Sequence, residues 1–145
     1  MAKVILSSML VLLFLCSSGK RNTTIYVNVS NPFCIGCLTH LIEYLESNPR
    51  LAAKTKYLVN ESEYSNFVIL QNRLKKNFKV HSTIVSPASR EIESDSIHFG
   101  RAKYSPEVII RMGGNYIVFE NKTCFDNDML VSDTLRKTLL SLFLK

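Results

Sequence analysis

Apolar and polar residues in the first part of the chain follow two different periods. Apolar side chains at every second position predict a strand over residues 24–29. Spacings of three and four then predict a helix over residues 34–47. Pro49 ends this pattern because a proline disfavours helical geometry at the residue before it. The chain therefore begins with a strand that leads directly into an amphipathic helix.

The same alternation of elements is repeated once. A nearly continuous apolar run over residues 56–59 is typical of a buried parallel strand. A second helix is expected over residues 63–78, with Ser62 as its N-cap. A helix that joins two parallel strands makes a right-handed unit, so we expect an α/β domain.

The second part of the chain ends in a hairpin and a helix. The pattern is weak over residues 79–103, where only residues 83–85 have the character of a short strand. Apolar runs on either side of Gly113-Gly114 predict two adjacent antiparallel strands. Ser132 or Asp133 can cap a final helix that runs to the C-terminus. Residues 20–145 are therefore expected to form one domain.

The first 19 residues have the pattern of a signal peptide and tether. Lys3 precedes an apolar run that is too short to span a membrane comfortably. The run ends at Leu13-Phe14-Leu15-Cys16, which resembles a bacterial lipoprotein signal with cleavage before a lipidated Cys16. The alternative is ordinary cleavage near Ser18 or Gly19, which gives a secreted protein. Both predict a location outside the cytosol, where disulfides persist.

Composition and charge change this picture little. The chain has 145 residues and a formal charge of +6, from 18 basic and 12 acidic residues. The densest basic stretch is Arg73, Lys75, Lys76 and Lys79. Aromatic residues are not interleaved with these charges, so we interpret them as a solvated helix face and expect no nucleic-acid partner.

Candidate chemistry lies at the corner between the first strand and the first helix. Cys34-Ile35-Gly36-Cys37 places two thiols at a helix N-terminus, whose free N–H groups and dipole favour a thiolate. The dipole alone contributes about 0.3–1 kcal/mol, less than the 1.4 kcal/mol of one pKa unit. Stronger activation of Cys34, the expected nucleophile, therefore requires direct hydrogen bonds.

The motif and the order of elements resemble the thioredoxin-like fold family, and locally its lipoproteins of the bacterial cell envelope. The resemblance covers residues 24–145. It implies a three-layer α/β sandwich with a mixed, mostly four-stranded sheet flanked by helices. It further implies a cell-envelope thiol-disulfide oxidoreductase on the periplasmic side. Protein thiols and disulfides would be its partners, the membrane would hold it through a lipid on Cys16, and it would be a monomer without a cofactor.

Residue by residue, the resemblance assigns four roles. Cys34 matches the attacking thiol and Cys37 the resolving thiol. Pro106 matches a cis proline that faces the disulfide, and Ser105 the residue whose backbone contacts the substrate. The tryptophan usual before the first cysteine is Phe33 here, and the two residues between the cysteines also differ from those of reducing thioredoxins, so the direction of electron flow is not carried over.

Other interpretations of the same residues stay open at this point. The competing function is a binding lipoprotein whose cysteine pair is structural or vestigial. A zinc site of Cys34, Cys37 and His40 is a third interpretation, although no second paired motif supports it. Cys124 is an odd thiol, for which we expect burial as a small hydrophobic residue.

Overall fold

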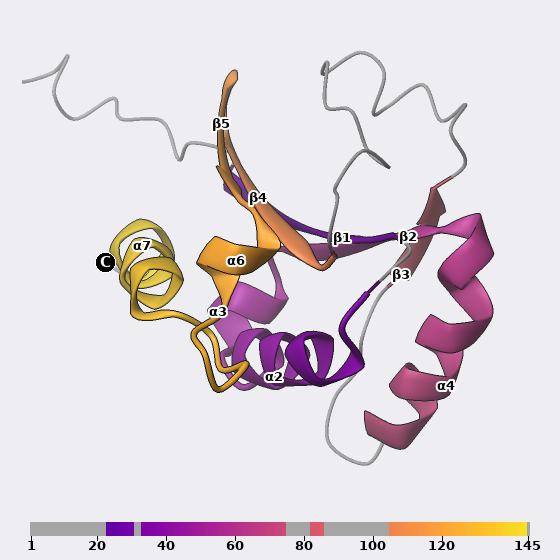
Figure 1. Cartoon of the computed structure of the whole chain (residues 1–145). Helices are drawn as coiled ribbons and strands as arrows, with labels where there is room; N and C mark the ends of the chain where they lie inside the picture. The colour runs from indigo at the N-terminus through magenta and orange to yellow at the C-terminus, as the bar shows by residue number, and fades with distance from the viewer. Residues whose placement is uncertain (1–22, 31–32, 75–81, 86–104, 145) are drawn as a thin grey trace, which may run out of the picture.

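A computed structural model of the chain describes residues 23–30, 33–74, 82–85 and 105–144 (Figure 1). The described residues form one five-stranded sheet with helices packed on it. The strands are β1 (Thr23–Val29), β2 (Thr55–Asn60), β3 (Ser82–Val85), β4 (Glu107–Met112) and β5 (Asn115–Phe119). The expected α/β class and the mixed sheet are confirmed.

The strand that precedes the cysteine pair occupies the centre of the sheet. The strand order is β3-β2-β1-β4-β5, with β1 parallel to β2 and antiparallel to β4. The hairpin of β4 and β5 lies where the sequence predicts it, and its turn uses Gly113 at φ 64°, a conformation that glycine adopts without steric cost. The fifth strand, β3, pairs in parallel with β2 at the sheet edge. Its position was only weakly marked in the sequence.

The helix after β1 carries the cysteine pair. It is α2 (Ile35–Glu46), and Cys34 is its N-cap. The predicted stop is also found, but Asn48 caps a second short helix, α3 (Pro49–Ala52), which the sequence analysis missed. Proline is well tolerated at the first position of a helix, where its missing N–H group is not needed, so Pro49 both ends one helix and starts another.

The helix after β2 begins differently from the expectation. A 3-10 turn, η1 (Glu61–Glu63), leads into α4 (Tyr64–Leu74). The side-chain cap is Asn60, whose oxygen accepts from the Ser62 N–H at 3.3 Å, so the prediction of Ser62 as the cap was wrong. Asn and Ser are about equally good caps, and the earlier start of the turn decides between them.

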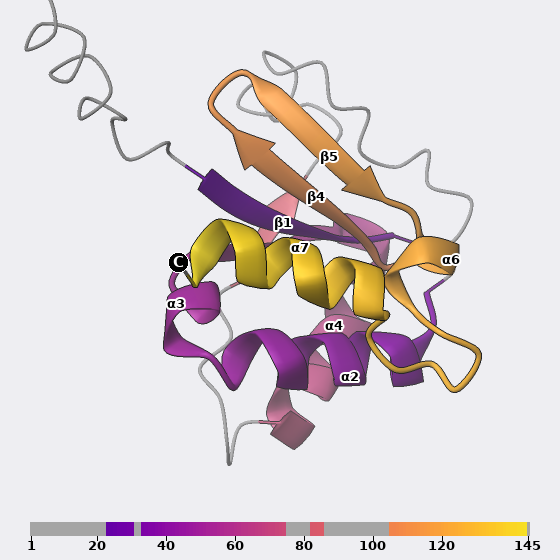
Figure 2. The same cartoon turned by 90° about the vertical axis from the view of Figure 1, so that its left-hand side faces the viewer.

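The chain closes with two helices after the hairpin. They are α6 (Asn121–Cys124) and α7 (Asp133–Phe143). The Ser132 side chain accepts from the Leu135 N–H at 3.3 Å and caps α7, as one of the two predicted candidates. The loop of residues 125–132 between these helices lies beside the first turn of α2 (Figure 2).

The described helices lie on one face of the sheet, so the described part of the chain has two layers instead of three (Figures 1 and 2). Tyr57 of β2 and Phe67 of α4 show this directly, with ring centroids 5.9 Å apart on the same face that α2 covers. The reason is the strand β3. The chain moves across the sheet from β1 to its neighbour β2 and then on to β3, without turning back. Because both crossovers are right-handed, α2 and α4 lie on the same face of the sheet.

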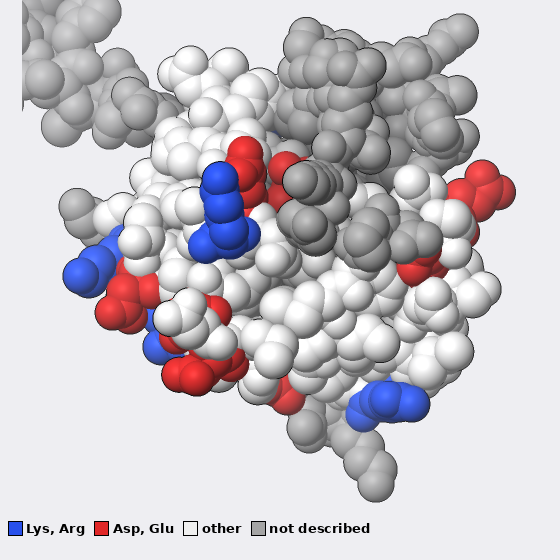
Figure 3. Space-filling view, in the orientation of Figure 1, with Lys and Arg blue, Asp and Glu red and all other residues white. Residues whose placement is uncertain are grey.

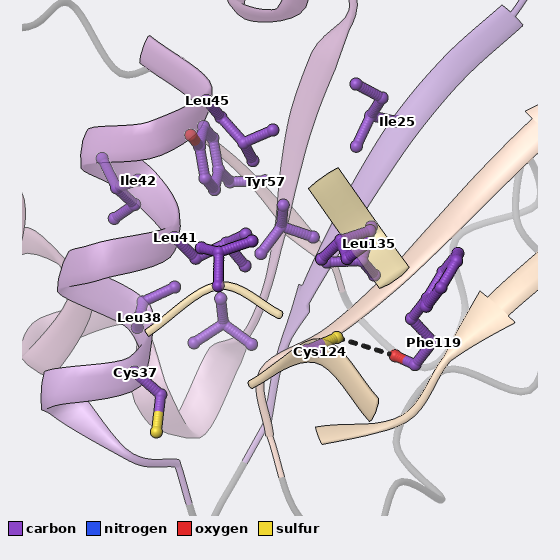
Figure 4. Packing of buried hydrophobic residues seen from close by; sticks show 14 of the residues in the cluster. Ile25, Cys37, Leu38, Leu41, Ile42, Leu45, Tyr57, Phe119, Cys124 and Leu135 are labelled. Carbon is purple, nitrogen blue, oxygen red and sulfur yellow. Dashed lines mark hydrogen bonds between the residues drawn. The ribbon is translucent and has the colours of Figure 1, made fainter. Parts of the chain in front are cut away.

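The hydrophobic core fills the space between this face and the helices (Figure 4). Helix α2 contributes its fully buried apolar stripe, Leu38, Leu41, Ile42 and Leu45. Each such side chain stabilises the fold by about 1.5–3 kcal/mol through burial. The stripe fixes the rotation of α2 and therefore the direction in which its first turn faces.

Several predictions lie outside the described residues. They are the signal peptide with Cys16, the tether, most of the 79–103 segment and the last residues of the predicted 63–78 helix. Within the described parts of the chain, no helix is long and apolar enough to cross a membrane.

Candidate functional site

Cys34 and Cys37 form a disulfide at the N-terminus of α2. Their Cα atoms are 5.2 Å apart, within the range of protein disulfides. Cys34 is partly exposed, and Cys37 is buried with 5% of its surface accessible. Cys34 is therefore the more accessible of the two cysteines, which is the asymmetry that an attacking and a resolving thiol need.

The sulfur of Cys34 is also held by a backbone hydrogen bond. The Cys37 N–H donates to Cys34 Sγ at 3.2 Å, in the position of a side-chain N-cap. A charge-assisted bond of this kind favours the thiolate over the thiol when the pair is reduced, in addition to the dipole of α2. The direct hydrogen bond that the sequence analysis required is therefore present.

The predicted partner segment, Ser105-Pro106, lies directly beside the first cysteine. The Cys34 N–H donates to the Ser105 carbonyl at 3.0 Å, and the Ser105-Pro106 peptide bond is cis. The Ser105 hydroxyl donates to the Asn28 carbonyl at 3.0 Å and accepts from the Ser30 N–H at 2.9 Å. Ser105 therefore joins the end of β1, the start of α2 and the start of β4.

One residue of the site has no counterpart in the sequence analysis. The thioether of Met129 lies 3.8 Å from Cys34 Sγ. It also lies across Gly36, where an added Cβ would be 3.7 Å from the Met129 sulfur. Met129 comes 95 residues after Cys34 and follows no periodic pattern, so only the folded chain brings the two together.

The loop that carries Met129 is tightly hydrogen bonded. Asp126 Oδ1 accepts from the N–H groups of Asp128 at 3.0 Å and Leu130 at 2.9 Å. The Asp126 carbonyl accepts from the Met129 N–H at 3.1 Å, and the Asp126 N–H donates to the Leu130 carbonyl. Met129 itself has φ 61°, in the left-handed region that costs a non-glycine residue about 1–2 kcal/mol. The loop holds Met129 over the disulfide in spite of this cost.

His40 does not belong to the site. It lies in α2, partly exposed, with Nδ1 3.8 Å from Glu43 Oε2. Across the described ranges, no three His, Cys, Asp or Glu side chains are placed to hold a metal ion together. The zinc site of Cys34, Cys37 and His40 is therefore not formed, because His40 is directed along the helix surface toward Glu43.

The remaining described cysteine is buried, as expected. Cys124 in α6 has no accessible surface and is not bonded to another cysteine. Its Sγ lies 3.1 Å from the Phe119 carbonyl and donates to it (Figure 4). The pKa of the Cys124 thiol is raised to about 12, chiefly by burial; a backbone hydrogen bond with Val108 lowers it in part, and the Glu107 carboxylate adds a smaller rise. Cys124 is therefore protonated at neutral pH.

Charges on the described surface are mixed. On the face drawn in Figure 3, basic and acidic side chains are interspersed and separated by uncharged surface. Most of the basic stretch from Arg73 to Lys79 lies outside the described residues. Two of the described side chains next to the disulfide are apolar and exposed: Ile35 is 57% exposed and Met129 50%.

Cys34, Cys37 and Ser105, which the fold brings together, were predicted from the sequence, with Pro106 next to Ser105 in the chain; Met129 was not predicted. No family model matches the chain, and comparisons with curated proteins and with solved structures find no match either.

Proposed function

We propose that this chain is a thiol-disulfide oxidoreductase of the thioredoxin-like kind. The observation that carries the proposal is the Cys34–Cys37 disulfide at the N-terminus of α2, with Cys34 partly exposed and Cys37 buried. The mixed sheet and the Ser105-Pro106 segment beside Cys34 are compatible with such a fold.

The reaction follows from this asymmetry. In the reduced protein, the Cys34 thiolate attacks one sulfur of a partner disulfide, and the other partner sulfur leaves as a thiolate. Cys37 then loses its proton and attacks the mixed disulfide at Cys34. The partner leaves as a dithiol, and the Cys34–Cys37 disulfide forms. Two electrons pass to the partner, and a dithiol reductant restores the pair.

A structural role for the disulfide is the weaker alternative. A bridge between residues three apart restrains the unfolded chain little, because the loop it closes is very short. A purely structural pair would also have no need of an exposed sulfur hydrogen bonded at a helix terminus. The binding-protein hypothesis would gain support if the reduced pair were unreactive.

The test is reduction of insulin by the full chain with dithiothreitol as electron source. We expect Cys34→Ser to abolish the acceleration and Cys37→Ser to accumulate the mixed disulfide, which gel electrophoresis without reductant reveals. Cys124→Ala is the matched control and should keep the wild-type rate. Full activity in Cys34→Ser would contradict the proposal.

We further propose that the protein acts in the bacterial cell envelope, anchored by a lipid on Cys16. The support is the apolar stretch that ends at Cys16, together with the disulfide, which persists in oxidising compartments. The test is expression with labelled fatty acid. Label in the wild-type chain and none in Cys16→Ser is the expected result, and a free amino terminus at Ser17 or beyond would contradict it.

A further inference from the structure

Three sulfur atoms meet at the first turn of α2. Cys34 Sγ and Cys37 Sγ are bonded, and Met129 Sδ lies 3.8 Å from Cys34 Sγ. Thiol exchange uses the two cysteines and leaves the thioether without a role. Its position is nevertheless maintained by the Asp126 hydrogen bonds and by a left-handed backbone at Met129.

We propose that the reduced Cys34 and Cys37, together with Met129, form a binding site for a single copper(I) ion. Two thiolates and a thioether are soft ligands, and this set selects Cu(I) over hard cations. With metal–sulfur distances of about 2.3 Å, as in zinc thiolates, three sulfurs around a trigonal ion lie about 4 Å apart. The present separation of the Cys34 and Met129 sulfurs, 3.8 Å, already meets this requirement for one pair, and the two cysteine sulfurs move apart when their bond is reduced.

The surroundings suit the charge of such a site. Two thiolates and one Cu(I) carry a net negative charge, and the N–H groups and dipole at the start of the 12-residue helix α2 stabilise an anion. The Cys37 N–H already donates to Cys34 Sγ. The exposed surface of Met129 and Cys34 leaves the ion a route from solvent.

Binding requires reduction of the disulfide first. A dithiol reductant transfers two electrons and two protons to the Cys34–Cys37 disulfide and is itself oxidised to a disulfide. Coordination of Cu(I) by the two thiols then releases up to two protons, and the copper remains Cu(I). The inference depends on the pair being reducible, which thiol counting checks independently of copper.

The experiment is an anaerobic titration of the reduced full chain with Cu(I) against a chromogenic chelator, after Ellman's reagent has confirmed that the pair is reduced. We expect one Cu(I) per chain. Met129→Leu should lower the affinity for Cu(I) at least about tenfold, because mutation of a residue that only hydrogen-bonds to a metal ligand already lowers metal affinity by that factor. Cys34→Ser should lower it further.

Two variants serve as controls. Met112→Leu makes the same chemical change at the hairpin end of β4, away from Pro106, and should leave the affinity unchanged. His40→Ala should also have no effect, because His40 faces Glu43. X-ray absorption at the copper edge should find three sulfur neighbours in the wild type and two in Met129→Leu.

A titration with Zn²⁺ shows whether Met129→Leu weakens copper binding by removing a ligand or by disturbing the structure of the site. Zn²⁺ takes thiolate, imidazole and carboxylate ligands, so its affinity for the reduced pair should be the same in the wild type and in Met129→Leu. Equal losses of Zn²⁺ and Cu(I) affinity would overturn the proposal, as would an unchanged copper affinity in Met129→Leu. No copper binding by a verified dithiol would also overturn it, whereas the insulin assay would still test the oxidoreductase function.

Discussion

The two cysteine regions in the described part of the chain place the same side chain in opposite environments. At the start of α2, Cys34 is partly exposed and its sulfur accepts a backbone N–H. In α6, Cys124 is fully buried and its sulfur donates to the Phe119 carbonyl. Burial is the main cause of the difference, because it raises the pKa of the Cys124 thiol, whereas the hydrogen bond that Cys34 Sγ accepts favours a thiolate when the pair is reduced. The reactivity of each thiol is therefore set by its burial and by the hydrogen bonds around it.

The largest expected difference is in alkylation. Because burial raises the pKa of Cys124 from 9.0 to about 12, its thiolate fraction near neutral pH falls roughly a thousandfold. In the reduced full chain, iodoacetamide at pH 8 should modify Cys34 at least that many times faster than Cys124, as measured by mass spectrometry of peptides. In guanidinium the difference should disappear. Comparable rates in the folded protein would contradict the contrast between the two regions.

Reduction of the disulfide should have a limited effect on stability. The chain-entropy relation gives at most about 2 kcal/mol for a loop as short as that between Cys34 and Cys37. Guanidinium unfolding with and without a phosphine reductant measures this difference. A much larger loss would mean that the pair is mainly structural and would favour the binding-protein hypothesis.

The buried cysteine should instead make stability depend on alkaline pH. Its pKa is higher in the folded than in the unfolded state, so the folded state retains its proton while the unfolded state releases it above about pH 9. The contribution of Cys124 to the free energy of unfolding is therefore fully present below about pH 9. Above about pH 9 it decreases, by up to about 1.4 kcal/mol per pH unit. Unfolding measured at pH 8, 9 and 10 should show this decline.

Cys124→Ala should remove the decline between pH 9 and 10. Tyr57 provides the companion variant, because burial, and then the Glu46 carboxylate, raises the pKa of Tyr57 above its ordinary 10.0. Tyr57→Phe should therefore flatten the profile only above pH 10. A profile that Cys124→Ala leaves unchanged would show that the thiol does not govern this range.

The smallest expected effect concerns the helix termini. Under reducing conditions, Cys34→Ala should be about 1 kcal/mol less stable than Cys34→Ser, because serine can replace sulfur as the N-cap of α2. Glu120, the N-cap of α6, makes no side-chain cap bond, so Glu120→Ala should change stability by less than about 0.5 kcal/mol. Equal stabilities of the two Cys34 variants would show that the cap does not contribute.

Local patterns predicted most of the elements and the position of the cysteine pair. Apolar residues at every second position predicted the strand β1, apolar runs predicted β2 and the hairpin, and apolar residues three and four apart predicted α2. Each pattern reflects which face of the element is buried. The two-layer arrangement could not be predicted, since it depends on the pairing of β3 with β2, and residues 83–85 are too few to specify a partner. Met129 was missed because its place is set by the Asp126 hydrogen bonds of a loop.

Ser105 connects three chain segments around the disulfide with hydrogen bonds to Asn28, Ser30 and Cys34. None of these bonds involves sulfur, so all of them can persist when the disulfide opens. We therefore expect the backbone of the site to be the same in both redox states, with only side-chain rotation at the two cysteines. If the pair cycles as proposed, little reorganisation energy would accompany each transfer of electrons, because the framework around the two sulfurs would stay fixed.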